Sequence, residues 1–419
     1  MHNSVLVIGG GITGMEVSLM LANAGKKVYL VEKSPIIGGN VIKCEHVFPN
    51  LECATCMIAP KQQEVLQNPD IELLTLSEVK EVKGKVGDFK VKIHKKARYV
   101  DLVNCIGCGA CYEPCPVSVK NEYEENLGER KAIYVPYAGS LPNVPLIDTD
   151  NCLRFKGEDC QACKEACMFE AINFDEKDED IELEVDAIVV ATGFKLSIPS
   201  DSKYGYGKFD DVYTAYEFER LFASNGPTNG NIYKKDGTTP KSVAIIHCVG
   251  REERGYCSRI CCMYSFKFAH YIKEKIKEAK VTQFYREICT PGKSYDKFVE
   301  EIKKSGVELI KFEEIEVAPK NGSIEIKYKA NGKEKVLSVE MVILSSVLEP
   351  HDDKNQFAKV LGIECDEYGF YKEKDEFEPV LSTKEGIFIA GCAQSPKDIE
   401  SCVAQAQEVA GKILQLYGR

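Results

Sequence analysis

The sequence predicts an α/β fold in which a dinucleotide-binding domain is interrupted by a small cysteine-rich segment and followed by a second α/β domain. Three observations predict this fold. An apolar strand, a glycine-rich turn and a helical pattern open the chain. Eight cysteines with paired spacing lie within residues 105–167. Strand-like runs at 187–190 and 242–246 alternate with helical patterns, as expected for parallel sheets.

Composition limits the class of protein. The 419 residues suffice for two or three domains, and 44% apolar and 28% charged residues are typical of globular proteins. The net charge of −11 comes from acids and bases mixed along the chain, which argues against nucleic-acid binding. No apolar run approaches the roughly 20 residues of a spanning helix, and no export signal precedes the first strand. We therefore expect a cytoplasmic protein without direct membrane insertion.

The opening turn has the G-x-G-x-x-G pattern of a dinucleotide-binding site. Its three glycines serve in order for the tight turn, the close approach of a pyrophosphate, and helix–strand packing. The second strand, 28–31, ends at an acid 18 residues after the last glycine, where a carboxylate binds the ribose. Lys33 and Gly39, from the VEKSPIIGGN segment, are added to the site. The predicted cofactor-binding residues near the N-terminus are therefore Gly9, Gly11, Gly14, Glu32, Lys33 and Gly39.

Two later segments indicate FAD rather than NAD. Strand 187–190 runs into Ala191-Thr192-Gly193, a turn common to flavoproteins with two dinucleotide domains. Segment 386–394 resembles the strand that closes their FAD site, so Gly391 and Cys392 are also assigned to the cofactor, although Asp is usual where Cys392 stands. The second α/β domain opens with strand 242–246 but lacks the glycine turn, so we expect no ordinary NAD(P)H site there.

Two cysteine runs predict a pair of 4Fe–4S clusters. The first has the C-x2-C-x2-C-x3-C-P spacing, whose fourth cysteine ligates the other cluster in two-cluster proteins. The second run keeps the C-x2-C-x3-C spacing after a longer first gap. Crossed ligation then gives the quartets Cys105, Cys108, Cys111, Cys167 and Cys115, Cys152, Cys160, Cys163. Zinc is the competing interpretation, which the interlocked quartets and the trailing proline make less favourable.

Two other cysteine groups leave alternatives open. Cys248, Cys257, Cys261 and Cys262 either ligate a cluster or are buried or redox-active thiols. The second group consists of Cys44, Cys53 and Cys56. It either holds a cluster with a fourth ligand from elsewhere, contains a CxxC dithiol, or is purely structural.

With these motifs placed, the chain resembles the A-type subunit of heterodisulfide reductase over nearly its whole length. The segments that carry the resemblance are VIGGGITG, VEKSPIIGGN, FPNLECATC, the ferredoxin-like insertion, KAIYVP, VVATGF, YCSRICCMY and FIAGCAQSPKDI. The resemblance implies a thioredoxin-reductase-like flavoprotein core with an inserted two-cluster ferredoxin domain. It also implies a short form, without the extra N-terminal domain and C-terminal ferredoxin of longer members. In extent it is similar to the A-type subunits of quinone-interacting oxidoreductase and benzoyl-CoA reductase complexes.

The resemblance also implies residue roles and partners. Cys248, Cys257, Cys261 and Cys262 would bind a third 4Fe–4S cluster near the flavin, and Lys267 would approach flavin N5. Glu217 or Glu219 would lie near the ring. The implied partners are heterodisulfide reductase B/C-like subunits and a hydrogenase, formate dehydrogenase or NADH-oxidising module. The chain would form a homo-oligomer within the hetero-complex.

These expectations define domains and functions. We predict FAD-domain pieces at 1–97, 173–235 and 351–419, the ferredoxin insertion at 98–172, and a degenerate NAD(P)H-type domain at 236–350. The leading functional hypothesis is an oxidoreductase subunit in which the flavin splits electron pairs between protein partners, or joins single electrons in the reverse direction. One alternative is a linear electron relay between a partner reductase and a quinone-linked membrane module. The other is a non-catalytic assembly scaffold.

Overall fold

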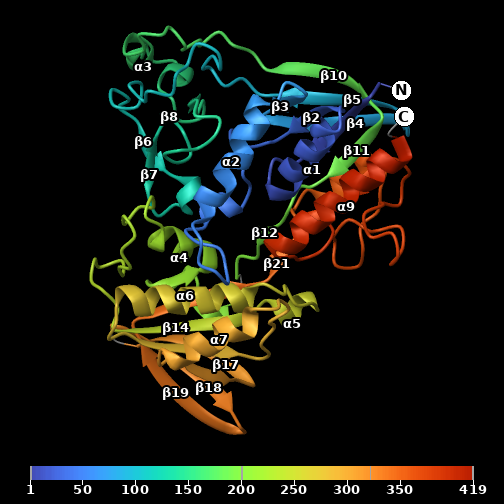
Figure 1. Cartoon of the computed structure of the whole chain (residues 1–419). Coiled ribbons are helices and arrows are strands. Elements are labelled where there is room, and N and C mark those ends of the chain that lie inside the picture. The colour runs from blue at the N-terminus through green and yellow to red at the C-terminus, as the bar shows by residue number, and fades with distance from the viewer. Residues whose placement is uncertain (1, 200–201, 321, 418–419) are drawn as a thin grey trace.

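The computed structural model describes residues 2–199, 202–320 and 322–417. Its first sheet has five parallel strands in the order β22-β11-β1-β2-β3. The strands are β1 (Ser4–Ile8), β2 (Lys27–Val31), β3 (Ile71–Leu74), β11 (Ala187–Val190) and β22 (Ile387–Ile389). Their near-continuous apolar runs reflect a sheet that is buried on both faces. Helices α1 (Ile12–Asn23), α2 (Ala54–Gln67) and α9 (Ile399–Tyr417) pack beside this sheet (Figure 1).

The second sheet also has five parallel strands, in the order β13-β20-β14-β15-β16. They are β13 (Val212–Thr214), β14 (Ser242–Val249), β15 (Lys280–Tyr285), β16 (Glu308–Lys311) and β20 (Met341–Ser346). Its helices are α4 (Ala215–Phe222), α5 (Arg251–Arg254), α6 (Cys261–Lys275) and α7 (Tyr295–Lys304). An antiparallel meander of β17 (Glu314–Lys320), β18 (Ser323–Ala330) and β19 (Lys333–Val339) follows β16. Strand β13 joins this sheet although it lies within residues 173–235, which the sequence assigned to the first domain.

A small antiparallel sheet links the first sheet to the cysteine-rich part of the chain. It consists of β4 (Ser77–Lys85), β5 (Asp88–Lys95) and β10 (Glu179–Val185), in the order β10-β5-β4. Between β5 and β10 the chain makes a separate lobe, called here the cysteine segment (residues 98–172) (Figure 1). A β-bridge between Val100 and Ile172 brings its two ends together.

The cysteine segment contains little regular structure. Its elements are β6 (Ser118–Lys120), η2 (Glu122–Glu124), β7 (Glu129–Lys131), β8 (Ile133–Tyr134), β9 (Leu146–Ile147), η3 (Arg154–Lys156) and α3 (Ala162–Glu165). Four cysteines and eight other apolar residues form its buried core. The remaining elements are η1 (Val41–Lys43), β12 (Lys195–Leu196), η4 (Ser202–Tyr204), β21 (Leu348–Glu349), α8 (Lys354–Leu361) and η5 (Gly391–Ala393).

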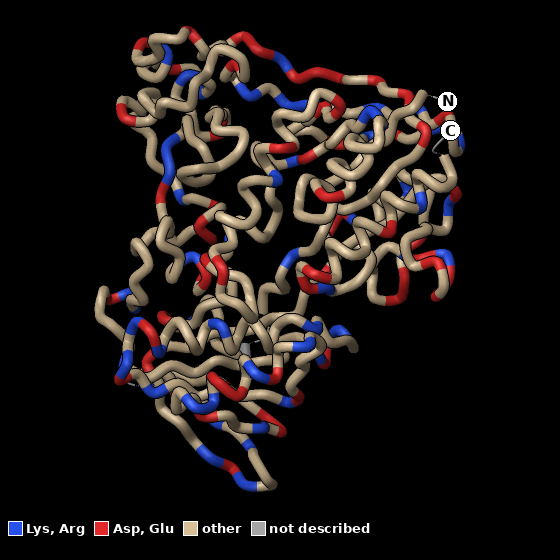
Figure 2. The backbone as a smooth tube through the Cα atoms, in the orientation of Figure 1, with Lys and Arg blue, Asp and Glu red and all other residues tan. Residues whose placement is uncertain are grey.

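Charged residues of both signs are distributed over the parts of the chain around both five-stranded sheets and over the cysteine segment (Figure 2). Within the described ranges, no helix combines the length and the apolar character needed to cross a membrane.

Candidate functional site

The glycine turn after β1 is built from backbone contacts that exclude side chains. Gly9 has φ +109°, and a Cβ there would lie 2.3 Å from the Ala191 carbonyl oxygen. A Cβ on Gly14 would lie 1.9 Å from the Gly9 carbonyl oxygen. Helix α1 begins at Ile12, so Gly14 lies in its first turn, and the N-cap residue Gly11 supplies no side-chain cap. The first N–H groups of α1 are therefore left for a ligand, and an anion is the ligand that suits them.

The predicted ribose-binding acid has backbone partners within the same turn. Glu32 accepts hydrogen bonds from Gly10 N–H at 2.7 Å and from Ser34 N–H at 2.7 Å. A carboxylate accepts about four hydrogen bonds, so acceptor capacity remains for a hydroxyl ligand. The turn at Gly39 packs against Gly11, since a Cβ on Gly39 would lie 2.8 Å from the Gly11 Cα.

Lys33 and the Ala191-Thr192-Gly193 turn lie on the side of the site that faces residues 351–353. Lys33 is exposed, and its Nζ lies 3.9 Å from the carboxylate of Asp353. His351 Nε2 lies 3.0 Å from the carbonyl oxygen of Thr192, within hydrogen-bonding distance. Burial lowers the pKa of His351, which favours the neutral imidazole. Gly193 has φ +76°, so the chain turns there without a side-chain clash.

Gly391 and Cys392 lie beside the glycine turn from the opposite end of the chain. Gly391 N–H donates to Gln405 Oε1 at 2.7 Å, and a Cβ on Gly391 would lie 2.4 Å from the Thr13 hydroxyl oxygen. The Cys392 thiol is buried 3.8 Å from the sulfur of Cys402 on α9. At the position where Asp is usual, this chain therefore has a thiol that already has a thiol partner.

The two predicted ferredoxin quartets each surround one cavity. The first cavity is lined by Cys105, Cys108, Cys111 and Cys167, together with apolar residues such as Ile106 and Phe169. The second is lined by Cys115, Cys152, Cys160 and Cys163, with Pro116 and Phe174 among its other residues. Each cavity has an empty volume of about 350 Å³, part of which is open to solvent. Each therefore takes cysteines from both runs, as the crossed pattern requires.

The third cysteine group surrounds another cavity, at the carboxyl end of β14. Its lining includes Cys248, Cys257, Cys261 and Cys262, and its empty volume is about 270 Å³. The hydrogen bond with Cys261, helped by His247, lowers the pKa of the Cys262 thiol and so favours a thiolate. In an ordinary dinucleotide-binding domain this end of the first strand would carry the glycine turn.

The donor sets suit iron–sulfur clusters. Each cavity offers four cysteine sulfurs, the ligand set of a 4Fe–4S cluster. Backbone N–H groups point at several of these sulfurs: Gly107 at Cys105, Arg259 at Cys257 and Cys289 at Cys262, each at 3.4 Å. In the described part of the chain, no three His, Cys, Asp or Glu side chains come close enough to hold a single metal ion.

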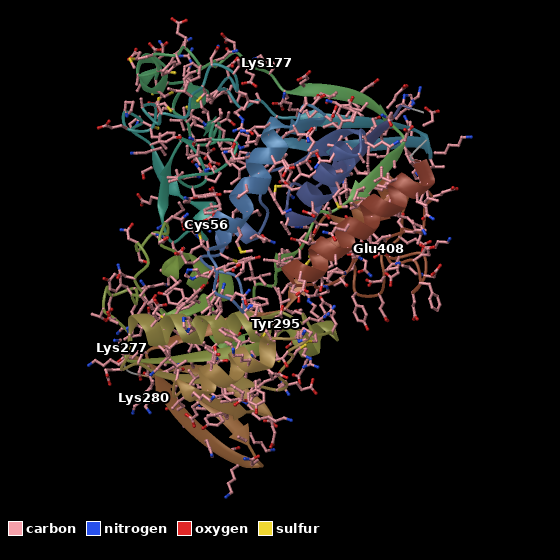
Figure 3. The ribbon with its side chains drawn as sticks, viewed as in Figure 1. Cys56, Lys177, Lys277, Lys280, Tyr295 and Glu408 are labelled. Atoms are coloured by element: carbon pink, nitrogen blue, oxygen red, sulfur yellow. A yellow bond between two sulfur atoms is a disulfide. The ribbon has the colours of Figure 1, made fainter. Side chains whose placement is uncertain are left out.

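Cys44, Cys53 and Cys56 line none of these three cavities. Cys53 and Cys56 are joined by a disulfide at the N-terminus of α2, which corresponds to the dithiol alternative. Cys56 is exposed, at the end of α2 that faces the second sheet (Figure 3). Cys44 remains a free thiol, and burial and the Glu219 carboxylate raise its pKa to about 11.

Lys267 forms a buried ion pair with one of the two glutamates considered from sequence. Its Nζ donates to Glu219 Oε2 at 2.8 Å and to the His46 carbonyl at 2.9 Å, and both charged side chains are at most 3% exposed. Glu217 has other partners, because it completes the capping box of α4 with Thr214 and accepts from the Tyr206 hydroxyl. The structure thus brings Lys267 together with Glu219, and with the loop that carries the disulfide.

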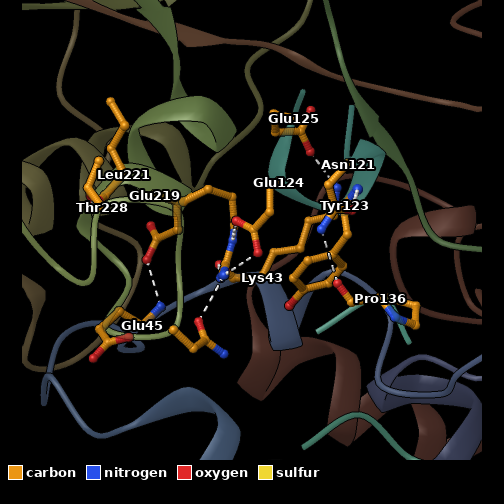
Figure 4. A network of polar contacts seen from close by, with 12 residues as sticks. Lys43, Glu45, Asn121, Tyr123, Glu124, Glu125, Pro136, Glu219, Leu221 and Thr228 are labelled. Atoms are coloured by element: carbon orange, nitrogen blue, oxygen red, sulfur yellow. Dashed lines mark hydrogen bonds and ion pairs between the residues drawn. The ribbon is translucent and has the colours of Figure 1, made fainter. Parts of the chain in front are cut away.

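A neighbouring network joins three parts of the chain. The guanidinium of Arg220, on α4, binds both carboxylate oxygens of Glu124 at 2.8 and 3.1 Å and the Lys43 carbonyl at 3.0 Å. Glu45 N–H donates to Glu219 Oε1 at 2.9 Å in the same region (Figure 4). Helix α4 therefore connects the cysteine segment and the 43–45 loop to Lys267.

Sequence reasoning missed several residues of this region. Arg220 and Glu124 are 96 positions apart, and nothing in the local pattern distinguishes them from surface residues. Cys289 and Cys402 belong to none of the cysteine groups recognised in the sequence, yet they contact Cys262 and Cys392. Their only sequence signal is the chemistry of the cysteine itself.

Comparison with known proteins agrees with this architecture. Residues 1–113 match the pyridine nucleotide-disulphide oxidoreductase family. Thioredoxin reductase from T. acidophilum superposes with a TM-score of 0.57 at 15% identity, covering all of both chains, which concerns the fold alone. The chain is 39% identical over 422 residues to the A-type subunit of the H(2):CoB-CoM heterodisulfide,ferredoxin reductase of Methanothermobacter thermautotrophicus. It is 41% identical over 424 residues to the A-type iron-sulfur subunit of the CoB--CoM heterodisulfide reductase of Methanocaldococcus jannaschii.

The fold places the chain in the structural class with a thioredoxin-reductase-like core, as the sequence predicted. Within that class, the chain is related to the A-type subunit of heterodisulfide reductase. The alignments cover 98% of this chain and 63% and 64% of the two relatives, respectively.

Proposed function

We propose that the chain is an electron-transfer subunit that binds FAD at the glycine turn and holds a 4Fe–4S cluster in each of the three cysteine-lined cavities. The observation that carries the proposal is the grouping of twelve cysteines into three quartets, two of them crossed between separate runs. Bound FAD would exchange electrons in pairs, whereas each cluster would exchange them singly.

The chain's own residues support flavin binding in two places. The uncapped start of α1 offers N–H groups to the pyrophosphate, and Glu32 keeps acceptor capacity for the ribose. Lys267 and Glu219 supply a buried charge pair between the two sheets, in the region where the resemblance expects the flavin ring. Because Glu219 neutralises Lys267, the pair as a whole, rather than a lone cation, would set the local field.

We further propose that the flavin divides electron pairs between two protein partners within a heterodisulfide-reductase-like complex. The support is the number of cluster cavities. One quartet lies on the second sheet, and two lie in the cysteine segment, so two separate exits are available.

Cysteine-to-serine variants test the cluster assignment. Cys115→Ser and Cys160→Ser, from different runs, should lose the same cluster signal in the spin-resonance spectrum of the reduced protein. Cys111→Ser should lose a different one. Cys365→Ser is the matched control, since Cys365 lines none of the three cavities, and it should keep the full iron content. If Cys115→Ser and Cys111→Ser removed the same signal, the crossed quartets would be wrong.

An anaerobic redox titration of the flavin absorbance tests the division of electron pairs. Two one-electron steps with inverted potentials, seen as a single two-electron transition, support it. Two well-separated one-electron transitions would favour the linear relay.

A further inference from the structure

A group of exposed apolar side chains marks one end of the cysteine segment. The group, called here the apolar collar, consists of Leu102, Val103, Ile106, Met168 and Phe169. Val103 is 90% exposed and Met168 is 89% exposed. The described residues include fourteen exposed large apolar side chains. Five of them are concentrated in the two short turns of the apolar collar. Such a concentration of exposed apolar surface is typical of an interaction site.

The two turns of the apolar collar lie side by side. Val100 and Ile172 form a β-bridge, and Asp101 N–H donates to the Ala171 carbonyl at 2.8 Å. This pairing brings residues 102–106 next to residues 168–169. Ile106 and Phe169 also line the cavity of Cys105, Cys108, Cys111 and Cys167. The collar therefore surrounds the mouth of that cavity.

This cavity is the more accessible of the two in the cysteine segment. Cys108 is exposed, whereas the quartet of the second cavity contains no exposed cysteine. The lobe that carries the collar projects away from the second sheet (Figure 1). A redox centre in the first cavity would thus lie within reach of another protein.

Acidic residues adjoin the apolar collar in sequence and form its rim. Asp101 precedes Leu102, Glu170 follows Phe169, and Glu165 lies three residues before Met168; all three are exposed, and none has an ion-pair partner among the described residues. The whole cysteine segment has twelve acidic and seven basic residues. An acidic rim around an apolar centre is complementary to a partner with basic residues around an apolar centre.

We propose that the apolar collar is the docking surface for a small one-electron carrier protein with a basic rim. The inference rests on the proposed function, because it needs a cluster in the first cavity. In the step, one electron passes from the reduced cluster to the redox centre of the docked carrier. The cluster is oxidised and the carrier is reduced by one electron, and no covalent bond forms or breaks.

The probe is cytochrome c, a one-electron carrier whose exposed haem edge is ringed by lysines. The reconstituted protein is reduced with dithionite, desalted and mixed anaerobically with oxidised cytochrome c in a stopped-flow instrument. The second-order rate constant should fall about tenfold when both Val103→Thr and Met168→Gln are present, because the apolar contact is lost. The matched control is Phe377→Gln, whose parent side chain is 93% exposed in another part of the chain. This control should retain the wild-type rate.

Charge variants provide an independent arm. Glu165→Lys with Glu170→Lys should also slow the reaction about tenfold at low salt, and the wild-type rate should fall as ionic strength rises. The proposal would be overturned if the collar variant and the Phe377→Gln control reacted at equal rates. It would also be overturned if the wild-type rate constant did not change with ionic strength. A third outcome against the proposal is a holoprotein dimer that the collar substitutions dissociate. In that case a second copy of the chain, and not an electron carrier, would cover the apolar collar.

Iron content separates this inference from the proposed function. If the wild-type protein lacks the cluster of the first cavity, the proposed function fails. If the collar variant keeps that cluster with its normal spectrum but reacts as fast as the Phe377→Gln control, the docking surface is rejected. The proposed function is then unaffected.

Discussion

Lys267 and Glu219 form a charge pair that stays buried because each group has additional hydrogen bonds. Lys267 donates to a carboxylate and a carbonyl, and Glu219 uses both oxygens, one toward Lys267 and one toward Glu45 N–H. Removing one partner of such a pair leaves an uncompensated buried charge, which typically costs about 3–5 kcal/mol. The pair also acts on Cys44, whose pKa is raised by burial and then by Glu219, while Lys267 opposes the rise.

The reactivity of Cys44 should report this electrostatic balance. With a pKa of about 11, the thiol stays protonated at pH 8, so its alkylation by iodoacetamide should be slow and should rise about tenfold per pH unit up to pH 10. Glu219→Gln removes a carboxylate that raises the pKa, so it should speed alkylation at pH 8. Peptide mass spectrometry measures both rates.

A matched control for that measurement is Glu217→Gln, since Glu217 caps α4 and does not pair with Lys267. A plateau in the Cys44 rate below pH 9 would contradict the assigned environment. The raised pKa also has a stability consequence. The contribution of the raised pKa to the free energy of unfolding is complete below the ordinary cysteine pKa of about 8.5, and it is lost as pH rises toward 11.

At the scale of elements, α4 is short but contacts both the cysteine segment and α6 of the second sheet. It begins with a capping box at Thr214 and Glu217. Adjacent residues then reach in different directions, Glu219 to Lys267 and Arg220 to Glu124. Arg220 also stacks over the ring of Tyr123, whose hydroxyl donates to the Ile42 carbonyl. Helix α4 therefore helps to hold the cysteine segment in position, together with contacts that do not involve α4, such as Arg98 Nη2 to the Pro35 carbonyl and Ile37 N–H to the Leu141 carbonyl.

Loss of Arg220 should release the cysteine segment locally. Arg220→Met leaves Glu124 buried without a cation, at a cost of about 3–5 kcal/mol. Limited proteolysis should then cut residues 118–131 at least tenfold faster than in the wild type, as measured by peptide mass spectrometry. Arg154→Met is the control, because Arg154 is more exposed and its ion pair with Asp159 is 3.7 Å long. Equal cleavage in the two variants would show that Arg220 does not hold the segment.

Local patterns predicted the elements well and the long-range contacts poorly. The strand-like run expected at 187–190 is β11, over Ala187–Val190, and the run expected at 242–246 lies within β14, over Ser242–Val249. The glycine turn was recognisable because its chemistry is local. The Arg220–Glu124 pair was not, because a salt bridge across 96 positions leaves no periodic signal. For the same reason the resemblance left Glu217 and Glu219 as alternatives near the site, and the coordinates assign Glu217 to a helix cap.

At the scale of the whole molecule, the cysteine segment has the smallest core. Its buried cluster contains four cysteines and eight other apolar residues, whereas each five-stranded sheet is covered by larger apolar clusters. A lobe with so small a core usually depends on metals or cross-links for stability.

Removal of iron should therefore unfold the cysteine segment selectively. After treatment with an iron chelator and an oxidant, amide hydrogens of residues 98–172 should exchange at least tenfold faster, as read by mass spectrometry. Strand β14 serves as the internal control, because it lies at the centre of the second sheet. Unchanged exchange in the segment would show that its fold is independent of metal.

The strand order of the first sheet has a consequence for synthesis. Strand β22 at its edge is formed by residues 387–389, whereas β1 at its centre is formed by residues 4–8. A ribosome therefore releases the cysteine segment and all strands of the second sheet before the first sheet gains its last strand. In the proposed function, this order would allow clusters to enter the nascent cysteine segment before the flavin site is complete. A chain stalled after residue 350 would expose the flank of β11 that β22 normally covers, and would be a substrate for chaperones.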